Sequence, residues 1–533
     1  MRLVINKNKL RLFFQIGLGL TLGLPIFYML IFSLLNAGNN QHLDYLISVL
    51  PIHFSNSIKL VFWSVFFSLI ISTYLACTFS LTNLWAKKII KPLTYLPLGI
   101  PLYISCFVFE GMFSYSSPMS TFFRNTISFD ITKIIHFDSA IQVGFIFSLY
   151  LSPYLTMPLS KAIESVGAGQ WPVAKTMGLT TTEVVLKILI PSCIPWIIGG
   201  AIIISMETLA DFGGVTAFNY DTLTTSIYTA WSGLFSLALA IKISFILLLL
   251  AAMLFFFEYR LNHKKQYSVL GSTFMAHPPI HLSITQNIFL LIPIIFYFSV
   301  AIILPLASLV SMADALAWPP IQLIEELTID SFSIATTAAL AITIFSLIHL
   351  SVYGRIKNIS IEIFKRIGLF GYTLPGPIIA VAMIGVFALL REYITILPTS
   401  GTSLLLAGLL FRFVYIAISN IESSLKRIPP GLKNSASIYL ENKWQLLKNL
   451  YIPFMKKSIP MAFLFVFIEV IKELPITLIL KPFGTNTLAT KIYEYTTEGE
   501  WEKAAQLSII LLIVLIPMSL IFNSVENKRH RNE

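Results

Sequence analysis

Long apolar runs separated by short polar segments recur along the whole chain and set the first expectation about its fold. A helix that crosses a membrane needs about 20 predominantly apolar residues. Twelve runs approach this length, and the pattern therefore predicts an all-α membrane protein with about twelve transmembrane helices. The predicted spans are 12–35, 59–81, 93–113, 138–158, 192–212, 232–257, 287–311, 332–352, 367–390, 402–420, 455–474 and 506–523.

A polar segment in the middle of the chain divides these spans into two sets of six. It covers residues 258–286 and is predicted to be a cytoplasmic linker. Residues 1–257 would then form a first transmembrane half, and residues 287–533 a second.

The two halves end one of their apolar runs with related acidic motifs. Glu207 and Asp211 stand in the first half, and Glu469 and Glu473 follow them at a distance of 262 residues. Residues four apart on a helix share a face, so each pair is expected on one helical face. A long-period repeat in a hydrophobic chain is typical of a pseudo-symmetric membrane protein whose working surface lies between its halves. The repeat continues in the stretches 222–228 and 487–493, now 265 residues apart.

Composition and charge support a membrane location. Hydrophobic residues make up 56% of the chain and charged residues 12%, with a mean hydropathy of +0.79, whereas soluble domains carry about 25% charged residues. With the N-terminus placed inside, 27 Lys and Arg residues fall in inside segments, seven in outside segments and three within spans. Basic residues concentrate on the cytoplasmic side of membrane proteins. The pattern predicts both termini in the cytoplasm and accounts for the net charge of +11 without nucleic acid as a partner.

The acidic pairs are the strongest candidates for function. Ionisable residues at membrane depth are costly and usually line a cavity or a pathway. In one interpretation, Glu207, Asp211, Glu469 and Glu473 line a cation path at the outer end of two spans, where four carboxylates would repel an anion. In the other, they are helix-end acids that face outer water or pair with nearby lysines such as Lys472. The chain itself is not expected to bind a cofactor, and no metal site is predicted.

Two long inside loops, 160–191 and 420–453, have similar layouts. Each contains two short predicted helices that meet at a turn. In the first loop, Gly178 stands at the turn. Thr180 and Glu183 follow it with the spacing of a capping box, in which the threonine and the glutamate each satisfy a backbone N–H of the other.

This layout resembles the cytoplasmic loop of ABC-importer permeases, whose pattern is Glu-Ala-Ala, three residues, Gly, nine residues and Ile-x-Leu-Pro. In that family the loop docks into a cleft on the ATP-hydrolysing subunit. The resemblance implies a type I importer-like fold and two copies of a separate ABC ATPase as partners. The chain has no P-loop, so we expect a transport subunit that is not itself an enzyme. The corresponding residues are Ala174, Gly178, Ile188 and Pro191 in the first loop, and Ala436, Leu440, Leu450 and Pro453 in the second, with Leu440 in place of the glycine.

The acidic motifs within 206–213 and 472–477 resemble the two-part permeases of bacterial ferric-iron importers. The resemblance implies an inner-membrane importer to which a periplasmic binding protein delivers ferric iron. Hard Fe(III) favours oxygen donors, which carboxylates supply. Related permeases carry thiamine or polyamines, which are also cations, so these substrates stay open. The outside stretches 213–230 and 475–505 are expected to contribute to the binding-protein surface.

Two other classes of membrane protein fit the sequence less well. Twelve spans also suit a proton-coupled secondary carrier, but that class should show charged relays deep in several spans, and such charges are few here. A polytopic membrane enzyme would need a clustered nucleophile or metal-ligand set, which the spacing of the residues does not indicate.

Overall fold

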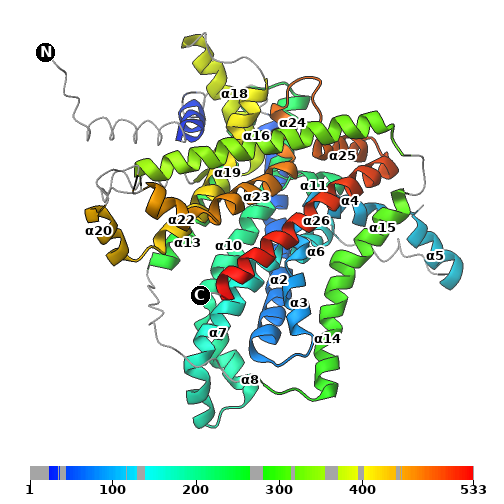
Figure 1. Cartoon of the computed structure of the whole chain (residues 1–533). Helices are drawn as coiled ribbons and strands as arrows, with labels where there is room; N and C mark the ends of the chain where they lie inside the picture. The colour runs from blue at the N-terminus through cyan, green and yellow to red at the C-terminus, as the bar shows by residue number, and fades with distance from the viewer. Residues whose placement is uncertain are drawn as a thin grey trace.

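The computed structural model describes residues 23–33, 35, 44–115, 117–128, 138–263, 280–313, 318–353, 370–393, 401–439, 445 and 447–531. Within these ranges the regular structure is helical, apart from one isolated backbone bridge between Thr82 and Ile280. This agrees with the predicted fold class of a helical membrane protein (Figure 1).

The first half of the chain forms a set of long helices joined by short ones. Its segments are Gly23–Ser33, η1 (Tyr45–Val49), α2 (Leu50–Leu81), α3 (Lys87–Leu93), η2 (Leu96–Gly99), α4 (Leu102–Phe113), α5 (Pro118–Ile127), α6 (Ser139–Leu151), α7 (Pro153–Thr176), α8 (Thr181–Glu183), η4 (Val184–Leu189), α9 (Ile190–Ser192), α10 (Ile194–Ala210), α11 (Gly213–Ala217), α12 (Leu223–Tyr228), η5 (Thr229–Gly233) and α13 (Leu237–His263).

The second half has a similar series. Its segments are α14 (Ile284–Phe298), η6 (Ser299–Ile303), α15 (Leu304–Ala313), α16 (Ile321–Tyr353), η7 (Phe370–Thr373), α18 (Gly376–Tyr393), α19 (Gly401–Lys426), α20 (Pro430–Tyr439), η8 (Leu447–Tyr451), α22 (Ile452–Met455), α23 (Ser458–Ile471), α24 (Pro475–Leu480), α25 (Leu488–Thr497) and α26 (Trp501–Arg531). Most of the predicted linker lies outside the described residues, and the division into domains stays a prediction.

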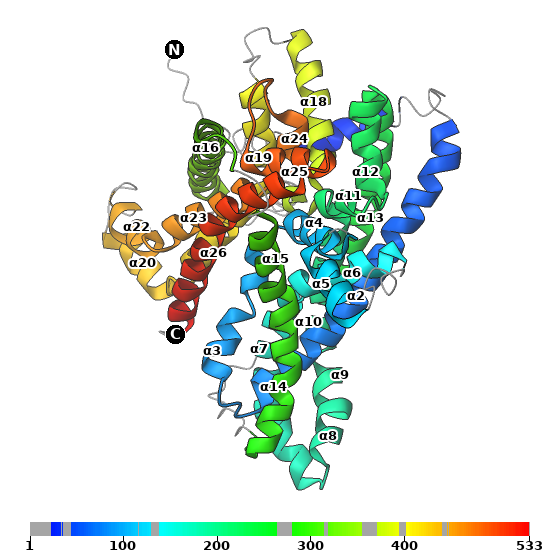
Figure 2. The same ribbon diagram turned by 90° about the vertical axis from the view of Figure 1, so that its right-hand side faces the viewer.

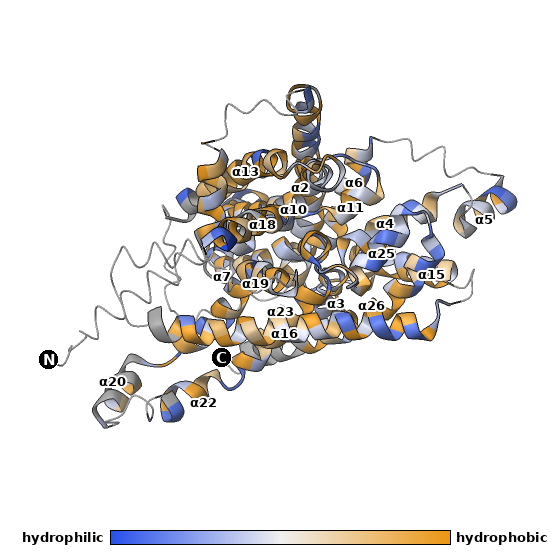
Figure 3. Ribbon diagram, turned by 90° about the horizontal axis from the view of Figure 1, so that it is seen from above, coloured by the Kyte–Doolittle hydropathy of each residue, from blue (hydrophilic) through white to orange (hydrophobic). Residues whose placement is uncertain are grey.

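The helices are strongly apolar, as the colouring in Figure 3 shows. In the described residues, seven are long and apolar enough to cross a membrane, or up to ten if three bent pairs each count as one span. The predicted count of twelve is therefore not confirmed. The sharpest bend, 90°, separates the α3–η2 segment from α4 at Pro101. Proline cannot donate a backbone hydrogen bond and interrupts a helix at such points.

The first described helix of each half packs against helices of the other half. On the second-half helix α14, Leu290 accepts a 2.7 Å hydrogen bond through its carbonyl oxygen from the Tyr74 hydroxyl on α2. Close by, the Tyr297 hydroxyl of α14 donates to the carbonyl oxygen of Leu149 on α6. In the opposite direction, Tyr28 lies against Gly385 of α18. Figure 1 shows the green α14 next to the blue and cyan helices of the first half.

The short helices α12 and α25 are held in the same way in the two halves. Each begins with a threonine capping box, formed by Thr222 with Thr225 and by Thr487 with Thr490. The next backbone N–H in each helix donates to a serine hydroxyl of a long helix. Leu223 donates to Ser57 on α2 and Leu488 donates to Ser331 on α16, at 3.0 and 2.8 Å. The tertiary contacts thus repeat along with the sequence.

Close helix packing depends on small residues. At Gly144 of α6, an added Cβ would lie 2.6 Å from the Trp63 Cβ and 3.1 Å from the Ser64 backbone nitrogen of α2. Small residues of this kind let membrane helices approach closely. At Gly199 of α10, by contrast, nothing lies within 4 Å of an added Cβ.

We predict that Gly144→Ala destabilises the protein by about 1–3 kcal/mol, because the added methyl group must push α2 and α6 apart. Gly199→Ala is the matched control and should leave stability unchanged or raise it, since alanine is the better helix former. Thermal unfolding of the two purified variants in the same detergent measures the difference. Equal melting temperatures would contradict the close contact between α2 and α6.

Candidate functional site

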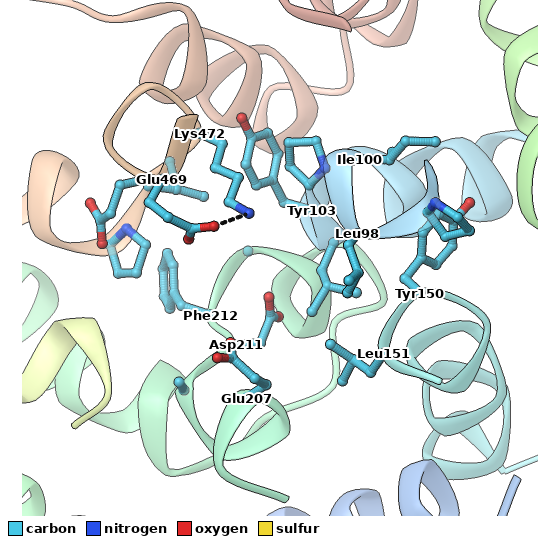
Figure 4. Close-up of a pocket in the computed structure, with 18 of the residues that line it drawn as sticks. Leu98, Ile100, Tyr103, Tyr150, Leu151, Glu207, Asp211, Phe212, Glu469 and Lys472 are labelled. Carbon is cyan, nitrogen blue, oxygen red and sulfur yellow. Dashed lines mark ion pairs between the residues drawn. The ribbon is translucent and has the colours of Figure 1, made fainter. Parts of the chain in front are cut away.

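A cavity of about 130 Å³ lies between the two halves and brings the predicted acids together. Its wall includes Glu207, Asp211, Glu469 and Glu473 (Figure 4). Fourteen of its lining residues form seven pairs related by the 262-residue offset of the sequence repeat. The pairs are Tyr150 with Arg412, Leu151 with Phe413, Glu207 with Glu469, Ala210 with Lys472, Asp211 with Glu473, Phe212 with Leu474 and Gly213 with Pro475.

Two of the four acids terminate helices and begin new ones. The Asp211 carboxylate accepts hydrogen bonds from the backbone N–H groups of Gly214 and Val215 at 2.8 and 3.2 Å. The Glu473 carboxylate accepts from the backbone N–H groups of Ile476 and Thr477, both at 3.0 Å. Each acid thereby satisfies orphan donors at the start of α11 or α24.

This capping corrects one expectation from the sequence. Both acids of each pair were expected on a single helix, but α10 ends at Ala210 and α23 at Ile471. Asp211 already has an extended backbone, with φ −71° and ψ 139°. Because its carboxylate bonds to N–H groups three and four residues ahead, the chain must leave the preceding helix at this point.

The other two acids face the cavity with few protein partners. Glu469 pairs with Lys472 on the next helical turn, at 2.9 Å between Oε1 and Nζ. Both side chains are partly accessible, at 14% and 19%. Glu207 is also partly buried, and its carboxylate forms no hydrogen bond or ion pair within the described part of the chain. Figure 4 shows Glu207 and Asp211 projecting from the first-half ribbon, with the Glu469–Lys472 pair on the opposite side.

Arg412, on α19, lines the cavity but is not among the residues that the sequence predicted for the site. Its Nη1 donates to Glu473 Oε1 at 3.0 Å, and the two side chains are only 14% and 3% exposed. An arginine inside a predicted span is a signal for a functional or paired residue. Sequence spacing did not reveal its partner, because the two residues are 61 positions apart.

An aromatic cluster adjoins the cavity. Phe212, which lines the wall, is 1% exposed and packs against Tyr228 and Tyr493, with ring centroids 4.9 and 5.4 Å away. The two tyrosine rings meet edge to face at 6.5 Å. Tyr228 and Tyr493 are equivalent in the 265-residue repeat, so the short helices α12 and α25 meet at this point.

The first predicted docking loop has the expected turn. Gly178 adopts φ +79° at the end of α7, where a left-handed residue is favourable only for glycine. The backbone N–H of Leu179 bonds back to the carbonyl of Ala174, which closes the helix end as in a Schellman motif. Thr180 and Glu183 form the predicted capping box on the other side of the turn.

Three large apolar side chains around this turn are exposed. They are Val173, Met177 and Leu186, at 60%, 74% and 59%. Of the predicted docking residues, Ala174 is buried, Ile188 is partly buried and Pro191 is exposed. Ala174 therefore supports the loop from within, while its neighbours present the outer surface.

The second loop is described only in part. Ala436 lies on α20 and is partly buried, Leu450 is buried in η8 and Pro453 is exposed on α22. Leu440 and the turn that follows it lie outside the described residues. The two loops project at different places in Figure 2, with α20 and α22 at the left and α8 and α9 at the bottom.

Comparison with known proteins identifies a related family of transport proteins. Residues 68–265 match the family of binding-protein-dependent transport system inner membrane components. This part of the chain therefore resembles permeases of the binding-protein-dependent type. The permease is also 20% identical, over 482 residues and 88% of both chains, to the Fe(3+)-transport system permease protein FbpB 2 of Haemophilus influenzae. Together these findings confirm the resemblance to fused permeases of the ferric-iron type and indicate a multi-pass protein of the inner membrane.

We predict that Arg412→Met destabilises the permease by about 3 kcal/mol, because it leaves the buried Glu473 carboxylate without its cationic partner. Lys472→Met is the control, since it breaks the more accessible pair and should cost much less. Thermal unfolding of both variants in detergent is the measurement. Equal losses would show that the Arg412–Glu473 pair is not the tighter of the two.

Proposed function

We propose that the permease imports ferric iron, which a periplasmic binding protein delivers to the outer side of the inner membrane. The cavity between the halves is the proposed route, with both termini in the cytoplasm and six helices in each half. The observation that carries this proposal is the convergence of four carboxylates on one cavity between two repeated halves. A relative named for Fe(3+) transport supports the choice of substrate.

The charge of the cavity favours a cation. Four carboxylates and two basic side chains line it, a formal balance of −2 when all six are charged. Field lines concentrate in a narrow cavity with apolar walls, which raises the local concentration of cations and repels anions. Carboxylate oxygens are also the donors that a hard trivalent ion prefers.

Energy for transport is proposed to come from two copies of a separate ATPase. The chain has no P-loop of its own, and its two loops at 160–191 and 420–453 supply two docking elements. The first presents exposed apolar residues on a capped, glycine-terminated turn. A rigid element of this kind can pass a rigid-body movement to α10, which ends at the cavity.

We predict that Met177→Asp reduces co-purification of the ATPase by tenfold or more, because a charge replaces a 74% exposed apolar contact residue. The matched control is Phe483→Asp, in the loop after α24, where another apolar side chain is fully exposed. The test is affinity purification of the tagged permease co-expressed with its ATPase. Full ATPase recovery with Met177→Asp would remove this loop from the docking surface.

The substrate is tested by uptake into vesicles that contain the permease, its ATPase and its binding protein. We expect ATP-dependent uptake of labelled ferric iron and none of labelled thiamine. Glu207→Gln combined with Glu469→Gln should lower iron uptake at least tenfold while the complex assembles normally, because both carboxylates face the proposed route.

Either of two results would overturn this proposal. Uptake of thiamine alone would keep the architecture and discard iron. Unchanged iron uptake by the double variant would remove these two acids from the route.

A further inference from the structure

The two basic residues that line the cavity have no basic counterparts in the first half of the repeat. Lys472 stands where the first half has Ala210, and Arg412 stands where it has Tyr150. Both cationic groups therefore come from the second half, while each half contributes two acids. Because the acids occur in both halves and the cations in the second half alone, each cation needs its own explanation.

Arg412 is explained by structure. Its partner Glu473 is 3% exposed and also accepts hydrogen bonds from two backbone N–H groups and the Thr477 hydroxyl. This network fixes the start of α24. A planar guanidinium held by such a carboxylate is well suited to a permanent contact.

Lys472 pairs with a carboxylate that accepts no further hydrogen bond within the described residues. Its ammonium group has one ion-pair partner in the described structure, Glu469, and both side chains border the cavity. A lysine ammonium sits on a flexible four-carbon stem, so it can leave its carboxylate when a cation takes its place. Figure 4 shows this pair across from Glu207 and Asp211.

A buried hydroxyl in the same wall has no partner. The Tyr103 side chain is 7% exposed, and its hydroxyl forms no hydrogen bond within the described residues. Buried polar groups are normally satisfied, and an exception calls for an explanation such as an absent ligand. An oxygen donor in a wall that also contains Glu207 and Glu469 suits a cation.

We propose that Lys472 is a tethered counter-ion, which neutralises Glu469 while the cavity is empty and is displaced by the cation in transit. This inference rests on the proposed function of the cavity as a cation route. Because the entering ion must compete with an ammonium already in place, Lys472 favours ions of high charge density over monovalent organic cations. It is thus a specificity-determining residue.

Terbium(III), a hard trivalent ion whose luminescence is sensitised by nearby tyrosine, is a direct probe. The full-length permease is placed in nanodiscs of phosphatidylcholine, and terbium is titrated while the aromatic residues are excited. We expect Lys472→Gln to bind terbium at least tenfold more tightly than the unchanged protein, and Lys472→Met to do the same. Lys472→Arg, which keeps the charge, should show no gain.

Two further variants separate a local effect from a general change of charge. Lys481→Gln removes a positive charge after α24, outside the cavity lining, and should leave terbium affinity unchanged. Adding Glu469→Gln to Lys472→Gln should abolish the gain. The inference is overturned if Lys472→Gln shows no gain, if Lys481→Gln shows the same gain, or if the gain survives the loss of Glu469.

The uptake assay distinguishes this inference from the proposed function. Lys472→Gln should raise thiamine uptake relative to iron uptake, because the barrier to weakly charged cations is lowered. If the unchanged complex carries neither substrate, the proposed function fails, while the terbium titration still tests the counter-ion. If iron is carried and the Lys472 variants behave like the unchanged protein in both assays, only the counter-ion is discarded.

Discussion

The structure around the cavity depends on how α10 and α23 end in an apolar part of the protein. A helix end leaves backbone N–H and C=O groups without partners, and in a membrane no water is present to satisfy them. Asp211 and Glu473 solve this at α11 and α24 by accepting the first N–H groups of each short helix. Loss of either carboxylate would take away the partner of these backbone N–H groups.

Helix capping by Asp211 and Glu473 divides the four acids of the cavity into two kinds. The carboxylates of Asp211 and Glu473 accept hydrogen bonds from backbone N–H groups, and Arg412 forms an ion pair with Glu473. Glu207 and Glu469 lie one helical turn earlier and keep their carboxylates towards the cavity. The wall therefore combines two carboxylates that hold the backbone with two that do not, Glu207 and the Lys472-paired Glu469. This separation is what makes a cation route chemically reasonable.

Interlocking of the halves places these groups opposite each other. Helix α14 packs on α2 and α6 of the other half, and α18 packs on the segment around Tyr28. Separation of the two halves would break these hydrogen bonds.

Much of this could be predicted from the sequence, because it depends on residues close together in the chain. Apolar run length predicted a helical membrane protein, the 262-residue offset predicted equivalent acids, and Gly178 with Thr180 and Glu183 predicted a capped turn. These are local signals of hydrophobicity, backbone conformation and short-range hydrogen bonding. Only the tertiary structure decided which acids cap helices, where prolines bend the spans, and that Arg412 pairs with Glu473. Those outcomes depend on contacts between distant segments, whose distances no periodicity in the sequence encodes.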